Sequence, residues 1–317
     1  MRIIEASCYV PESFLTIDDL ARHFKVDKYW IKKRTGIEKI HISRIPVDDM
    51  AFEAVKGLKK SYEGIIFVSS IGATYIPHYV QLLNKLGNNR QILGIDVIDG
   101  FNGFVKALYL AEKVFRDKVR RVLVVVAEKM SDLVETDNID TFILFSDAAV
   151  AMVVEFDDEI FTDYYQIQDF NYLRFLMIDP RGKLHMEGKQ VYKFAVNNIV
   201  KIIKKLTEGM NSLDKIVVVP HQANGRILQA VEKEMKKEER NIEIVNYIRY
   251  FGNTGSSSIP LALCHKYKGK KISLKNHVLI SVSGGMSALG ICWREVKNRD
   301  ENKHTDHEVA EYKISSY

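Results

Sequence analysis

Runs of β-branched and other apolar residues, each followed by a segment with helical spacing, constrain the fold of this chain more than any other feature. The runs predict strands at residues 2–10, 64–70, 94–99, 121–127, 148–154, 161–167, 215–219, 277–282 and 288–296. Helices are predicted at residues 48–58, 77–86, 103–115, 187–207, 223–237 and 257–267, and another is expected to begin at Thr16. Continuous apolar strands with helical connections predict an α/β fold whose sheets are buried on both faces.

The same alternation of strands and helices occurs twice along the chain, although no repeat is visible at the residue level. We therefore predict two pseudo-duplicated halves that form a layered fold, with an N-terminal half at residues 1–160 and a C-terminal half at 161–296. Residues 297–317 are polar and charged and are expected to form a C-terminal tail.

Composition and residue spacing argue against several classes of function. The chain has 317 residues, 46% of them hydrophobic, and a formal net charge of +5 that is spread along it, which argues against nucleic acid as a partner. No apolar run approaches the ~20 residues of a membrane span, and the first residues lack a signal-peptide pattern. The three cysteines, Cys8, Cys264 and Cys292, have no metal-ligand spacing. We expect a cytoplasmic protein without a metal site.

Two strand-to-helix turns carry the polar residues that suggest chemistry. Residues 220–227 read Pro-His-Gln-Ala-Asn-Gly-Arg-Ile and follow the strand at 215–219, whereas residues 251–260 contain Phe-Gly-Asn-Thr and Ser-Ile-Pro. The carboxyl ends of buried strands are where α/β proteins place their sites. A neutral imidazole (His221) and a carboxamide (Asn253) can donate hydrogen bonds to a developing oxyanion.

These two turns resemble β-ketoacyl-acyl-carrier-protein synthase III, a family of the thiolase-like superfamily. The resemblance extends from residue 1 to about 296, and further matching segments lie at residues 30–37, 96–104, 146–149, 186–195 and 283–287. It implies a thiolase-like α/β fold in which the two halves form an αβαβα arrangement of layers. It also implies that His221 and Asn253 are catalytic and stabilise the enolate of a thioester.

The resemblance assigns the remaining site residues to substrate binding. Gly284 and Gly285 would let a backbone N–H approach the thioester oxygen, because no Cβ is in the way. Trp30 would stack on the adenine of coenzyme A, with Arg34 nearby. Asn224 and Arg226 would belong to the approach for coenzyme A or for the phosphopantetheine arm of a carrier protein; these residue types also occur as helix caps and solvated helix charges.

One departure from the family pattern concerns the nucleophile. The family has a cysteine two residues before the glycine matched by Gly103, and this chain has Phe101 there. A phenyl ring cannot attack a thioester, so no acyl-enzyme can form at this position. Further departures are Ser146 and Ser283, which replace glycines, and the acidic segment 135–140, which lacks the arginines often found there.

The resemblance therefore implies a protein that acts on acyl or malonyl thioesters in fatty-acid or polyketide-type metabolism, with no tightly bound cofactor. Acyl-coenzyme A or acyl carrier protein is the expected partner, together with a second subunit in a homodimer or in a heterodimer with a paralogous synthase. Three functions stay open: condensing-type chemistry without the acyl-cysteine, which we favour; a non-catalytic partner of a cysteine-bearing synthase; and a relic that binds acyl-coenzyme A.

Overall fold

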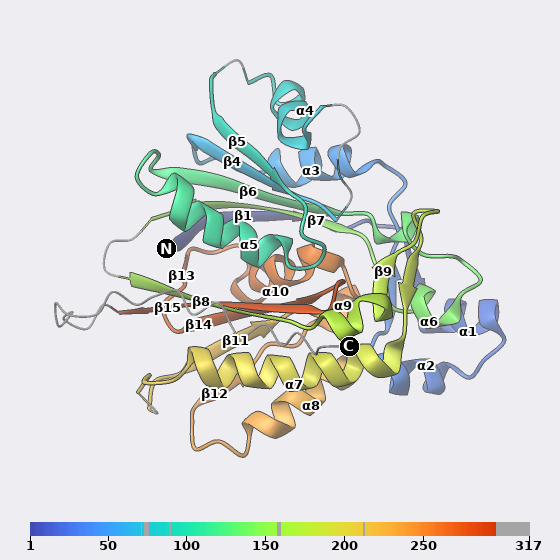
Figure 1. Ribbon diagram of the computed structural model, residues 1–317. Coiled ribbons are helices and arrows are strands. Elements are labelled where there is room, and N and C mark those ends of the chain that lie inside the picture. The colour runs from blue at the N-terminus through green and yellow to red at the C-terminus, as the bar shows by residue number, and fades with distance from the viewer. Residues whose placement is uncertain (71, 73–75, 89, 157–159, 212, 296–317) are drawn as a thin grey trace.

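The computed structural model describes residues 1–70, 72, 76–88, 90–156, 160–211 and 213–295, so the predicted tail at 297–317 lies outside the described residues. Two mixed sheets form the body of the molecule (Figure 1). The first sheet contains β1 (Arg2–Tyr9), β4 (Gly64–Val68), β5 (Leu93–Val97), β6 (Arg121–Glu128), β7 (Ala148–Glu155) and the short β13 (Ile272–Ser273). The second contains β8 (Ile160–Gln168), β11 (Ile216–Pro220), β12 (Ile242–Ile244), β14 (His277–Ser283) and β15 (Ser287–Glu295).

The strand order confirms the predicted duplication. The order is β5-β4-β6-β7-β1 in the first sheet and β12-β11-β14-β15-β8 in the second. If the five main strands of each half are numbered along the chain, both sheets have the order 3-2-4-5-1. The directions agree as well, because strands 3, 2 and 4 are parallel neighbours and strand 5 pairs antiparallel with strands 4 and 1 in both sheets.

Helices cover both sheets and also fill the space between them, which gives the expected αβαβα layers (Figure 1). Helices α3 (Val47–Val55) and α4 (His78–Lys85) lie outside the first sheet, whereas α7 (Gly188–Leu206) and α8 (Gly225–Met235) lie outside the second. Between the sheets lie α5 (Gly103–Leu110), continued by a π-helical turn at Ala111–Phe115, and α10 (Ser258–Tyr267). Residues 258–264 of α10 are all buried, as a helix between two sheets requires.

The helix expected to begin at Thr16 is α1 (Ile17–Phe24), and Thr16 forms a capping box with Asp19. Short elements without a clear periodic pattern were not predicted. They are β2 (Phe14–Thr16), α2 (Lys28–Thr35), β3 (Lys39–His41), α6 (Ile139–Phe142), β9 (Leu176–Ile178), β10 (Leu184–Met186) and α9 (Ile248–Phe251), besides β12 and β13. Strand β13 pairs with β1 in the first sheet although it comes late in the chain, so the halves are interlocked and the boundary at residue 160 stays a prediction.

Candidate active site

His221 directly follows β11 and is held from two sides. Its backbone N–H donates to the carbonyl of Ile280 on β14 (2.7 Å), and its Nδ1 lies 2.6 Å from the hydroxyl of Ser258. That hydroxyl oxygen also accepts the N–H of Gln222 (3.2 Å), so its own hydrogen is available to Nδ1. This pairing favours the tautomer with hydrogen on Nε2. Burial lowers the pKa of His221 to about 3, so the ring is neutral at physiological pH.

Asn253 is fixed by a backbone bridge to the loop before β7. Its N–H donates to the carbonyl of Leu144 (2.9 Å), and its carbonyl accepts the N–H of Ser146 (2.9 Å). In the side chain, Nδ2 donates to the carbonyl of Ala223 (3.3 Å), and Oδ1 accepts the N–H of Gly255 (3.1 Å). Since the first bond uses one of the two amide hydrogens, the other remains for a ligand.

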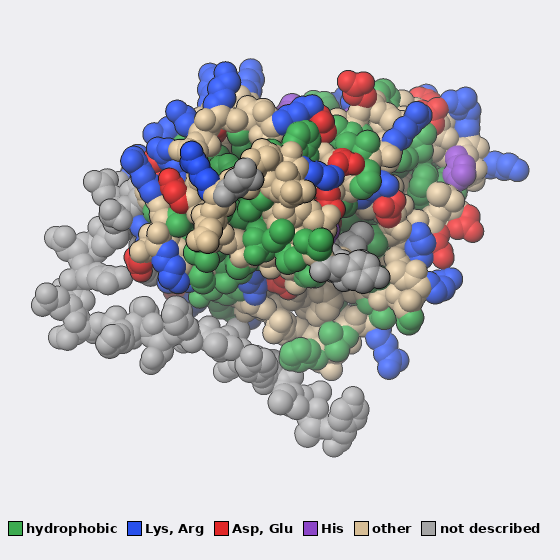
Figure 2. Space-filling model, turned by 90° about the horizontal axis from the view of Figure 1, so that it is seen from above, with side chains coloured by type: hydrophobic (Ala, Val, Ile, Leu, Met, Phe, Trp, Pro, Cys, Tyr) green, Lys and Arg blue, Asp and Glu red, His purple; other side chains and the backbone are tan. Residues whose placement is uncertain are grey.

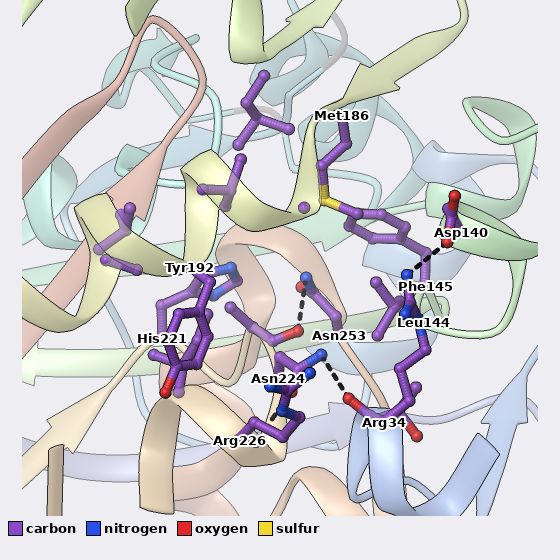
Figure 3. Close-up of a pocket in the computed structure, with 18 of the residues that line it drawn as sticks. Arg34, Asp140, Leu144, Phe145, Met186, Tyr192, His221, Asn224, Arg226 and Asn253 are labelled. Carbon is purple, nitrogen blue, oxygen red and sulfur yellow. Dashed lines mark hydrogen bonds and ion pairs between the residues drawn. The ribbon is translucent and has the colours of Figure 1, made fainter. Parts of the chain in front are cut away.

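His221 and Asn253 line the same cavity, which has a volume of about 290 Å³ (Figure 3). Its wall is mainly apolar and comes from both halves of the chain. The lining residues include Phe101, Leu144, Phe145, Leu176, Met186, Val191, Tyr192, Ala195, Ile227 and Val282. An apolar cavity with a few fixed polar groups is typical of a small-molecule site.

The rim of the cavity brings together residues that are far apart in the sequence. Helices α2 and α8 meet at a glycine contact, because a Cβ at Gly225 would lie only 2.9 Å from the Cα of Gly36. Asn224 caps α8 and donates from Nδ2 to the carbonyl of Arg34 (3.2 Å). The Arg34 guanidinium lies 5.1 Å from the ring centre of Trp30, which is 41% exposed and does not line the cavity.

Arg226 lines the cavity from the first turn of α8. Its guanidinium lies 5.4 Å from the ring centre of Tyr192 on α7. The structure thus places six of the predicted site residues around one space: Arg34, Phe101, His221, Asn224, Arg226 and Asn253.

Phe101 also lines this cavity and lies just before α5 in the chain. Its ring centre is 5.3 Å from that of His221 and 6.1 Å from that of Phe145. Its backbone N–H donates to the hydroxyl of Ser283 (2.9 Å). The same hydroxyl lies against Gly100, which has a positive φ of 47°, and a Cβ there would approach it to 2.4 Å. The N–H of residue 101 is therefore already paired within the protein.

Phe101 and Leu176 also line a second cavity of about 290 Å³, so they lie between the two spaces. The predicted glycine pair, Gly284 and Gly285, lines this second cavity and not the one that contains His221. The N–H of Gly285 donates to the carbonyl of Leu176 (3.2 Å). The sequence predicts one site for all of these residues, whereas in the structure they line two cavities that share Phe101 and Leu176.

Three contributors to the site were missed. Ser258, which holds His221, stands inside the second turn motif, and its spacing from Asn253 was a usable signal. Asp140 lines the cavity and belongs to the acidic segment noted above. No local sequence pattern marked Glu128. It is fully buried at the end of β6 and accepts hydrogen bonds from Ser70 and Ser256, close to the Asn253 turn.

Comparison with solved structures identifies the fold class of this protein. The crystal structure of 3-oxoacyl-[acyl-carrier-protein] synthase III from Aquifex aeolicus VF5 superposes with a TM-score of 0.82 at 25% identity, covering 92% of this chain and 99% of that chain. The enzyme from Pseudomonas aeruginosa PAO1 superposes with a TM-score of 0.81, also at 25% identity, over 93% of this chain and 98% of that one. The fold is therefore that of the thiolase-like condensing enzymes.

Sequence comparison gives the family. Residues 95–168 match the model of 3-oxoacyl-[acyl-carrier-protein] synthase III, and residues 207–294 match that of its C-terminal part. The β-ketoacyl-[acyl-carrier-protein] synthase III of Acholeplasma laidlawii is 32% identical over 308 residues, which span 90% of this chain and 96% of that protein. The chain belongs to the β-ketoacyl-acyl-carrier-protein synthase III family.

No described helix has the length and apolar character needed to cross a membrane. In the part of the chain that the structure describes, no three His, Cys, Asp or Glu side chains gather as a metal site would require.

Proposed function

We propose that this protein binds malonyl or acyl thioesters of coenzyme A or of a carrier protein and that it decarboxylates a malonyl thioester without forming an acyl-enzyme. The observation that carries the proposal is the pairing of His221 and Asn253 in one apolar cavity, each fixed from behind and each with a hydrogen-bond donor left for a ligand. Gly284 and Gly285 line the other cavity, and the proposed step does not use them.

The chemistry follows from these donors. The bond between the carboxylate carbon and the α-carbon of the malonyl group breaks, carbon dioxide leaves, and the electron pair moves onto the thioester oxygen. His221 Nε2–H and the spare Asn253 amide hydrogen would stabilise that enolate oxygen, and a neutral ring would not hold the substrate carboxylate as an ion pair. Protonation at carbon then gives the acetyl thioester. No nucleophile takes part, so Phe101 does not prevent the reaction.

The test uses purified protein with malonyl-coenzyme A and, separately, a malonyl carrier protein, and follows the release of acetyl thioester. We expect His221→Ala to lower the rate by roughly 100-fold, the usual effect of losing one oxyanion donor. The matched control is His185→Ala, an exposed histidine on β10 that does not line the cavity. Equal rates in the wild type and the His221 variant would refute the proposal.

A second function is favoured by Phe101, which stands where the resemblance expects the nucleophile and whose N–H is paired with the Ser283 hydroxyl. The chain would be a non-catalytic subunit that pairs with a cysteine-bearing synthase of the same family, or a protein that binds acyl-coenzyme A without turnover. Co-purification from the native source separates these functions: a stoichiometric synthase partner supports the subunit, and a homodimer that binds acyl-coenzyme A but releases no product supports the binding protein.

We also propose that the protein forms a dimer, with itself or with a paralogous synthase, along β5. This strand is the edge of the first sheet and pairs only with β4 among the described strands. Figure 2 shows hydrophobic side chains gathered on the face that carries β5 and α4. We call this set the β5 patch; it consists of Ile76, Val80, Leu93 and Ile98, which are 38–60% exposed. An edge strand beside exposed apolar residues is suited to pairing with a second subunit.

A further inference from the structure

The cavity rim is cationic with one exception. Arg34, Lys189 and Arg226 line the cavity, and Asp140 is the single carboxylate among its described lining residues. Asp140 Oδ1 lies 2.7 Å from Nη2 of Arg34, and both side chains are about half exposed, at 57% and 43%. Figure 3 shows this pair meeting on one side of the cavity. Asp140, the carboxylate of the rim, therefore forms its ion pair with Arg34.

The ion pair is built by two separate elements. Asp140 lies in the first turn of α6, where its N–H donates to the capping side chain of Asn138 (3.1 Å). Arg34 lies in the last turn of α2 and has Trp30 against its guanidinium (5.1 Å). One side of the guanidinium thus faces an aromatic ring while its edge faces a carboxylate. Arg226 differs, because among the described residues no carboxylate lies within ion-pair distance of it.

We propose that Asp140 is a specificity-determining residue that weakens the binding of nucleotide-bearing thioesters more than the binding of a phosphopantetheine arm with one phosphate. This inference rests on the proposed function. A phosphate that approaches Arg34 must compete with Asp140 for the same N–H groups, and it also meets the negative charge of the carboxylate. A ligand with more phosphate charge at the rim meets a larger penalty. Arg226 is left to bind the single phosphate that both kinds of ligand share.

The experiment titrates coenzyme A, dephospho-coenzyme A and 4′-phosphopantetheine into the wild type and into Asp140→Asn by calorimetry. We expect Asp140→Asn to raise the affinity for coenzyme A about five-fold, with a smaller gain for dephospho-coenzyme A and less than about two-fold for phosphopantetheine, since an exposed ion pair contributes little more than this. The control is Asp137→Asn, an exposed acid three residues away that does not line the cavity, and it should change none of the three affinities.

A second variant tests the route through Arg34. If Asp140 acts by pairing with the Arg34 guanidinium, its effect should depend on Arg34. In a protein that already carries Arg34→Met, adding Asp140→Asn should then not raise the affinity for coenzyme A. Equal gains for all three ligands, or equal effects of the Asp140 and Asp137 variants, would overturn the inference while leaving the proposed function intact. A wild type that binds none of the three ligands, and no malonyl thioester, would overturn both.

Discussion

At the scale of single residues, the identity of residue 101 and the hydroxyl of residue 283 shape the site together. Phe101 lines both the His221 cavity and the second cavity, and the Ser283 hydroxyl accepts the backbone N–H at the same position. Position 101 therefore combines an apolar side chain with a paired backbone N–H. A thiol introduced there alone would leave this N–H paired with Ser283 and unable to bind a thioester oxygen.

We predict that Phe101→Cys alone gives little acyl-enzyme with acetyl-coenzyme A, whereas Phe101→Cys combined with Ser283→Gly gives at least about ten times more, because the N–H is then free to stabilise an oxyanion. Intact-mass spectrometry measures the adduct, with the wild type as the baseline for its three native cysteines. Phe145→Cys, which places a thiol elsewhere in the same cavity, controls for non-specific acylation. Equal acylation of the single and double variants would contradict the role of Ser283.

At the scale of elements, strand ends and helix contacts position the candidate site residues. The β11 strand carries His221, the contact of α2 with α8 brings Arg34 beside Asn224, and the loop before β7 holds Asn253. These contacts join the two halves, because α2 meets α8 and the loop before β7 bridges to Asn253. By contrast, the outer side of β5 has no partner among the described strands.

We predict that Ile98→Lys in the β5 patch shifts the protein from dimer to monomer at micromolar concentration, since a buried lysine at a pairing edge is strongly unfavourable. Light scattering coupled to size exclusion measures the mass. Leu213→Lys is the matched control: it is the same change at a leucine that is 83% exposed and lies between α7 and β11. A variant at Ile98 that remains dimeric, or a wild type that is monomeric, would show that β5 is not the interface.

At the scale of the whole molecule, a buried carboxyl links the first sheet to the Asn253 turn. Glu128 on β6 accepts hydrogen bonds from the Ser70 hydroxyl (2.8 Å) and N–H (3.1 Å) and from the hydroxyl of Ser256. Burial raises its pKa from 4.5 to about 7, although the hydrogen bonds from these serines act in the opposite direction. The protonation of this one side chain is therefore linked to the stability of the fold.

Because the pKa of Glu128 is higher in the folded state, its contribution to stability is fully present below pH 4.5 and is lost as the pH rises through about 7. We predict that the difference in unfolding free energy between the wild type and Glu128→Gln falls by roughly 3 kcal/mol between pH 4.5 and pH 8. Urea unfolding at a series of pH values measures this difference. The exposed Glu12→Gln serves as the control, and parallel pH profiles for the wild type and Glu128→Gln would contradict the assignment.

The major strands and helices could be predicted because each is long enough to show its own period. The helix at α7 and the buried strand β11, for example, begin and end within two residues of their predicted limits. The short elements β9, β10 and α6 were not predictable in this way, since their pairing depends on neighbours that are distant in sequence. Those elements contribute Leu176, Met186 and Asp140 to the cavity wall, so the site was less predictable than the fold.

The sequence by itself determined the layered α/β fold, its duplication and the turns that carry His221 and Asn253, because periodicity and local turn chemistry are properties of short segments. It also showed that residue 101 is not a cysteine. Only the tertiary structure decided that Phe101 lines two cavities, that Gly284 and Gly285 line the second of them, and that Asp140 pairs with Arg34. These arrangements join residues separated by 100 positions or more, and only the packing of the folded chain brings them into contact.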